Sequence, residues 1–132
     1  MPEIEPLAVA AGALASFAIG SVYYVVFAAQ LAEARGNAAP AADEQPPPWR
    51  LAVEFGRGLV LAAVVAGLAA QGGIDDPGGG LSLGLVLWIG FPAVLWAGAM
   101  LWEGTAPRLA AVHAGDWLIK LIAIGIIVAA WQ

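Results

Sequence analysis

Three side chains that can carry charge or exchange protons, His113, Asp116 and Lys120, lie in the last long apolar segment of this chain. Their spacing of three and then four residues places them on one face of a helix, stacked over two turns. Ionisable side chains at membrane depth are costly, and they normally face the interior of a bundle and pair with one another. An imidazole, which ordinarily titrates near neutral pH, suits proton exchange beside a carboxylate. We therefore expect any ligand or ion to bind on this face.

Several roles are open to such a face. It is a charge-balanced network that fixes helix packing, or a relay through which an ion or small solute moves, in a proton-coupled way. It is also compatible with an intramembrane enzyme in which His113 is the base and Lys120 the nucleophile or an electrostatic clamp. A haem bound by His113 from two copies is a further option. We favour a non-enzymatic role in binding or moving a solute, because no serine lies at motif spacing and no phosphate-binding loop is present.

Composition places the chain in the membrane. Its 132 residues are 61% apolar and only 11% charged, and the mean hydropathy is +0.84, values typical of membrane proteins. A hydrocarbon core of ~30 Å needs a helix of roughly 20 residues. Four segments satisfy this length: 6–31, 50–71, 81–102 and 109–131. We predict an all-α, polytopic integral membrane four-helix bundle that forms a single membrane domain over residues 1–132.

The residues that are rare in this chain exclude several kinds of chemistry. It has no cysteine, which excludes thiol–disulfide exchange and thiolate-bound clusters. One histidine makes a metal site within one subunit poor in nitrogen ligands. A net charge of −5 argues against nucleic acid as a partner. We therefore expect no metal and no cofactor.

The few cations predict an orientation. Arg35 and Arg50 flank the first long connection and Arg108 lies in the third, whereas the second carries Asp75 and Asp76 and no cation. The positive-inside rule then places the first and third connections in the cytoplasm. The protein is thus expected in a bacterial-type inner (cytoplasmic) membrane, with both termini extracytoplasmic.

Depth along the helices predicts how the charges pair. At ~1.5 Å per residue from a cytoplasmic entry, Glu54 lies ~6 Å and Arg57 ~10 Å deep in the second segment. On the fourth segment His113 lies ~8 Å, Asp116 ~12 Å and Lys120 ~18 Å deep. We therefore predict pairs of Glu54 with His113 and of Arg57 with Asp116, with Lys120 lacking a partner at its own level on the second helix. The second and fourth helices would contact each other through these side chains.

The first segment carries a track of small residues at every fourth position, which lets another helix approach closely. The track comprises Ala8, Gly12, Ser16 and Gly20. Its partner is a helix of the same subunit or of a second copy, and we expect a homo-oligomer or a larger membrane complex. Tyr23 and Tyr24 follow in the cytoplasmic half, where their hydroxyls join the polar face or anchor the interface.

The proline and glycine residues predict where the connections between the helices lie. Residues 33–48 are proline-rich and predict an extended surface connector or a docking segment, and residues 71–80 predict a flexible reversal. The short connection 103–107 makes the third and fourth helices adjacent and antiparallel. Pro92 predicts a kink in the third helix. Three tryptophans lie deep in the spans and serve packing or the wall of an apolar pocket: Trp88, Trp96 and Trp117.

Two stretches resemble a known family. The first is Gly20-Ser-Val-Tyr-Tyr24 followed by Phe27 and Gly36, and the second is Trp88-Ile-Gly-Phe-Pro92 followed by His113…Trp117 and Gly125…Trp131. In order and segment length they are similar to the DUF1761 membrane proteins over nearly the whole chain. The resemblance implies a four-helix membrane bundle and implies no reaction.

Overall fold

In the computed structural model, which describes residues 4–30 and 47–131, five helices each begin at a proline. A proline in the first turn costs nothing there, because its missing N–H would have no partner within the helix. The helices are α1 (Pro6–Val26), α3 (Pro48–Gln71), α4 (Pro77–Gly90), α5 (Pro92–Trp102) and α6 (Pro107–Ala130). With α4 and α5 taken together, they form four spans long and apolar enough to cross a membrane. The protein is therefore an all-α membrane protein, as its composition predicts.

Helix starts differ from the predicted limits for local reasons. Helices α3 and α6 each begin two residues before the predicted 50 and 109. The predicted reversal 71–80 is wrong at its end, because α4 already begins at Pro77. There the carboxylate of Asp76 accepts a hydrogen bond of 3.2 Å from the Gly79 backbone N–H and caps the helix. The proline-rich connector 33–48, apart from Pro47 and Pro48, and the predicted end of the first span at residue 31 lie outside the described residues.

The kink predicted at Pro92 is confirmed. The helix is interrupted at Phe91, whose backbone angles of φ −122° and ψ −77° are not helical. Hydrogen bonding resumes at once, since the Leu95 N–H donates to the Phe91 carbonyl at 2.8 Å. The interruption separates α4 from α5.

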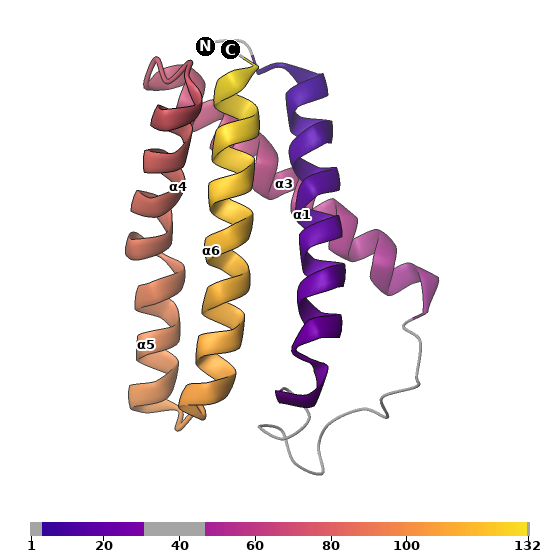
Figure 1. The fold of residues 1–132 in the computed structure, drawn as a ribbon, viewed down its shortest axis with the longest axis vertical. Coiled ribbons are helices and arrows are strands. Elements are labelled where there is room, and N and C mark those ends of the chain that lie inside the picture. The colour runs from indigo at the N-terminus through magenta and orange to yellow at the C-terminus, as the bar shows by residue number, and fades with distance from the viewer. Residues whose placement is uncertain (1–3, 31–46, 132) are drawn as a thin grey trace.

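Helix α6 lies at the centre of the molecule and packs against each of the other four helices. Figure 1 shows α4 and α5 along one side of α6 and α1 along the other, while α3 crosses behind them obliquely. The α5–α6 hairpin confirms that the third and fourth spans are adjacent and antiparallel. Both ends of the chain lie at the end of the bundle where α3 turns into α4, opposite the α5–α6 turn.

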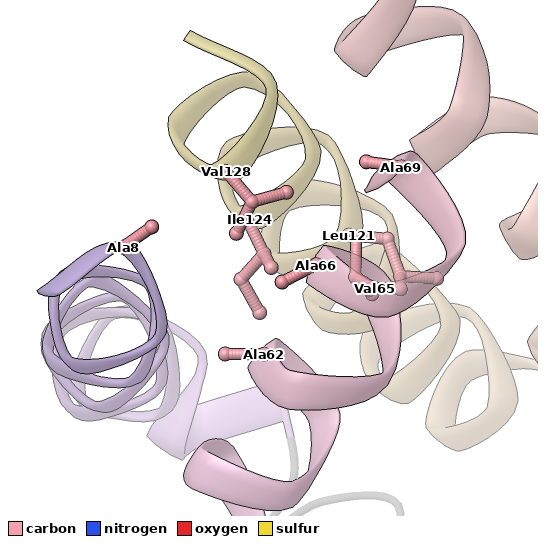
Figure 2. Close-up of a cluster of buried hydrophobic side chains, with 8 residues drawn as sticks. All are labelled: Ala8, Ala62, Val65, Ala66, Ala69, Leu121, Ile124 and Val128. Carbon is pink, nitrogen blue, oxygen red and sulfur yellow. The ribbon is translucent and has the colours of Figure 1, made fainter. Parts of the chain in front are cut away.

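Two kinds of contact hold α6 in place. Toward α1 and α3 it contributes to a cluster of small and branched side chains, shown in Figure 2, that point into one shared space. The cluster comprises Ala8, Ala62, Val65, Ala66, Ala69, Leu121, Ile124 and Val128. Toward α4 the contact is closer, because Gly80 and Gly125 bring the two backbones together: a Cβ on either glycine would overlap the other's carbonyl oxygen. Such close approach is how helices associate in lipid.

Candidate functional site

A buried ion pair lies halfway along α6. The Lys120 Nζ is 2.9 Å from Asp116 Oδ2, and the two side chains are 10% and 3% exposed. The two residues are four positions apart on one helix, a spacing that places them on neighbouring turns. Lys120 therefore has its partner on its own helix, whereas the prediction concerned only the second helix, on which Lys120 was expected to have no partner. The pair makes the centre of α6 electrically neutral without help from α3.

Helix α1 leaves room for this pair. A Cβ added to Gly20 would stand 3.1 Å from Lys120 Nζ, so the ammonium group rests against bare backbone. About two turns earlier in α1, Gly12 faces Ala62 of α3 and Ile124 of α6. Ala8 and Ser16 are also buried, at 2% and 5% exposure. The small-residue track of α1 thus packs against helices of its own chain.

A hydroxyl of α1 extends the ion pair into a chain of hydrogen bonds. The Oη of Tyr24 is 2.7 Å from His113 Nδ1 and donates a longer hydrogen bond, 3.4 Å, to Asp116 Oδ2. A hydroxyl has one proton, so both bonds form together only when His113 Nδ1 donates to the tyrosine oxygen. The chain then runs from His113 through Tyr24 to Asp116 and Lys120. We call these four residues the polar chain.

Helix α5 closes the polar chain on its third side with Trp96, which the sequence analysis did not place among the site residues. Its ring stacks on His113, with centroids 4.9 Å apart and planes 8° from parallel. The signal was available in the sequence. Trp96 lies six residues before the end of α5 at Trp102, and His113 lies six after the start of α6 at Pro107. A tight antiparallel hairpin therefore brings the two rings to the same level.

Two polar atoms beside His113 are buried and have no hydrogen-bond partner within residues 4–30 and 47–131. One is the acceptor Asp116 Oδ1 and the other is the donor Trp96 Nε1. Buried polar atoms are nearly always paired, with protein groups or with water. Within the described residues, the site thus holds one buried acceptor and one buried donor that lack a hydrogen-bond partner.

The predicted ion pairs between α3 and α6 are wrong, although the two helices pack against each other through apolar residues. Glu54 and Arg57 pair with each other, with 2.7 Å between Arg57 Nη1 and Glu54 Oε2, and their side chains are 44% and 63% exposed. The depth estimate assumed parallel helices, whereas α3 crosses the bundle obliquely (Figure 1). Its buried residues all lie in the part from Gly58 onward. Glu54 and Arg57 precede that part and therefore do not join the polar chain.

Of the two candidate tyrosines, Tyr24 belongs to the polar chain and Tyr23 supports it. The ring of Tyr23 packs edge-on against that of Tyr24, with centroids 5.6 Å apart. Its hydroxyl lies over Gly115 of α6, where a Cβ would collide with it. No group of three carboxylate or imidazole side chains that could hold a metal ion occurs in the described part of the chain.

The polar chain reaches only to the middle of the bundle. It begins at His113, near the α5–α6 turn, and ends at Lys120, which is the fourteenth of the 24 residues of α6. In the remainder of α6 the buried residues are apolar or glycine: Leu121, Ile124, Gly125, Val128 and Ala129. Among the buried described residues, Ser16 of α1 is the one polar side chain besides the ion pair itself. Within the described residues, the polar chain therefore occupies one half of the length of α6.

Comparison with known proteins confirms the family resemblance and adds no activity. A family model described as a protein of unknown function, DUF1761, matches residues 7–129. The match includes all four spans and every member of the polar chain. No curated protein and no solved structure matches the chain. The protein is therefore a four-helix membrane protein that belongs to the DUF1761 family of proteins of unknown function.

Proposed function

We propose that this protein is a non-enzymatic membrane protein that binds, and by binding moves, a small polar solute or ion at the polar chain, coupled to the transfer of a proton. The observation that carries the proposal is the buried Asp116 Oδ1, an acceptor with no partner in the described residues. An unsatisfied buried acceptor costs roughly 1–3 kcal/mol, and more when it is charged. A cation, or a ligand that bears a hydrogen-bond donor, relieves that cost.

The polar chain supplies a mechanism for the proton. With the Tyr24 hydroxyl turned to Asp116, His113 Nδ1 must donate to the tyrosine oxygen; with the hydroxyl turned to His113, Nδ1 must be bare. Loss of the Nδ1 proton therefore reverses the hydroxyl and removes a hydrogen bond from Asp116. A ligand that satisfies Asp116 in its place would favour the second arrangement. Proton release and ligand binding are coupled through one rotating hydroxyl.

We infer the orientation from the ends of the helices. Arg50, near the start of α3, and Arg108, near the start of α6, stand on the side of the first and third connections, whereas Asp75 and Asp76 precede α4 at the other end. The positive-inside rule places the arginine end in the cytoplasm of a bacterial-type inner membrane and both termini outside. The polar chain then opens toward the cytoplasm at His113.

The experiment that tests the proposal uses the single histidine of the chain as its own reporter. Protein labelled with ¹⁵N-histidine gives one pair of imidazole signals in lipid nanodiscs. The signals are recorded over a range of pH, and we expect them to move when the imidazole gains or loses a proton. At fixed pH, Na⁺, K⁺ and zwitterionic glycine are then added in turn, and at least one is expected to move the signals of the wild type.

Tyr24→Phe removes the hydroxyl that joins the ring to Asp116, so in that variant a ligand at Asp116 should no longer move the imidazole signals. Ser82→Ala is the matched control, because Ser82 also loses a hydroxyl but is exposed on α4 and bonds only to its own helix, at the Gly78 carbonyl. Signals that respond neither to pH nor to any probe would contradict the proposal.

A second function, an accessory subunit of a larger membrane complex, is favoured by one observation. Asp116 and Lys120 neutralise each other within α6, so the bundle needs no ligand to balance its buried charge. In that case the polar chain serves to hold α1 on α6 through Tyr24. The two functions differ in the imidazole experiment, since a purely structural chain does not respond to Na⁺, K⁺ or glycine.

A further inference from the structure

The side of α3 that faces away from the bundle carries Arg57, and its ion-pair partner Glu54 lies at the edge of that side, one turn before the buried Gly58. The buried residues of α3 lie on one face, from Gly58 to Ala69. The opposite face carries Val53, Val60 and Val64, which are 55%, 65% and 55% exposed. Arg57 lies among them, at spacings of four, three and four residues, with Glu54 beside it. This outer stripe of α3 follows one line along the helix.

Contact with lipid is unfavourable for the charged side chain of Arg57 at the centre of this stripe. Arg57 is the tenth residue of α3, about 14 Å along the helix at 1.5 Å per residue. A charged side chain within a span is costly and normally faces protein or a hydrated cavity. Here both members of the pair are substantially exposed, at 63% and 44%. We therefore expect the outer stripe to contact a polar group of another molecule and not lipid alone.

The charges and the shape of the outer stripe indicate which kind of partner fits it. The pair has no net charge, so it attracts neither an anionic headgroup nor a cation preferentially. A partner that presents one positive and one negative group at the same spacing matches it, and a second copy related by a two-fold axis does so by symmetry. A shallow apolar groove also runs along this face, lined by Gly56, Arg57, Val60, Leu61 and Val64.

We propose that two copies of this chain associate through their outer stripes, α3 against α3. Gly56, where a Cβ would meet nothing within 4 Å, leaves space for the partner helix. The alternating spacing of four and three residues is that of helices crossing at about 20°. Arg57 of each copy then lies within reach of Glu54 of the partner subunit, and the four charges form one network. The residues of this interface are not those of the polar chain.

Cysteine cross-linking tests the interface directly, because the chain has no cysteine of its own. With Val60→Cys in native membranes, mild oxidation is expected to convert most of the protein to a disulfide-linked dimer. The matched control is Val86→Cys on α4, since Val86 is exposed to the same 65% but lies on another helix. Equal cross-linking of both variants, or cross-linking of neither, would overturn the proposal.

A charge exchange tests the role of the ion pair. Adding Arg57→Glu to Val60→Cys places like charges at the interface, and the dimer yield is expected to fall severalfold. Adding Glu54→Arg as well restores opposite charges and should recover the yield. An unchanged yield with Arg57→Glu alone would overturn the interface. The interface would also be overturned if the Val60→Cys variant stays monomeric while the protein retains phosphatidylglycerol bound to Arg57.

Discussion

Gly80→Val is expected to prevent α4 from packing on α6. A Cβ at Gly80 would overlap the carbonyl oxygen and carbonyl carbon of Gly125, and it would come 2.8 Å from Ala129 Cβ. One turn further on, a Cβ at Gly84 would stand 2.6 Å from the Leu121 carbonyl oxygen. The opposing atoms belong to helix backbone, which has no rotamer by which to move aside. The two helices must therefore separate along their length.

The expected cost of Gly80→Val is at least ~3 kcal/mol in the free energy of unfolding, at the upper end of what overpacking costs. Since folded proteins are stable by only ~5–15 kcal/mol, much of the variant should be unfolded or proteolysed. Denaturant titration of the purified protein in micelles measures this. Gly98→Val on α5 is the matched control, because a Cβ there meets nothing within 4 Å. If both variants unfold alike, α4 and α6 do not approach through their glycines.

The number and limits of the spans were predictable because each depends on local sequence. An apolar run of about 20 residues and a proline in the first turn are properties that neighbours in the chain decide. The interruption at Phe91 follows in the same way from Pro92. The exception is the start of α4, where Gly78, Gly79 and Gly80 predict a turn. There the Asp76 cap and the packing of Gly80 on α6 outweigh the poor helix propensity of glycine.

The partners of the polar residues were only partly predictable. His113, Asp116 and Lys120 share a face because they share a helix, and that inference needs nothing beyond helical periodicity. Their partners depend on crossing angles, which periodicity does not contain. The depth of Arg57 matches that of Asp116 only if α3 runs parallel to α6, and it does not. The Tyr24 contact was within reach, because α1 is antiparallel to α6 and its small track leads directly to that residue.

The ion pair of Asp116 and Lys120 is expected to show a coupling energy far larger than an exposed pair. Asp116→Leu alone leaves the ammonium group of Lys120 without its counter-charge, and Lys120 is only 8% exposed. Removing one partner of a buried pair destabilises a protein by roughly 3–5 kcal/mol. Lys120→Leu alone leaves the carboxylate in the same position and is expected to cost a similar amount. Both single variants should therefore unfold at much lower denaturant concentrations than the wild type.

The double change Asp116→Leu with Lys120→Leu removes both charges together. Replacing a whole buried pair by apolar side chains is often neutral or stabilising, by about 1–4 kcal/mol. The double variant should thus recover the stability that each single variant loses. The matched control is Glu54→Gln with Arg57→Gln, which removes an exposed pair of 2.7 Å. Its coupling energy, measured on monomers in micelles, is expected to be ~1 kcal/mol or less.

This double variant also separates the two candidate functions. Because it is expected to fold, any loss in it reports on what the charges do and not on whether the bundle forms. In nanodiscs, the double variant is titrated with the ion or solute that moves the imidazole signals of the wild type. Loss of the response of His113 would support binding at Asp116. A response that survives without Asp116 and Lys120 would show that the ligand binds elsewhere. If the double variant is as unstable as the single variants, the ion pair is instead structural. In that case α6 requires its own pair of charges to fold against α1.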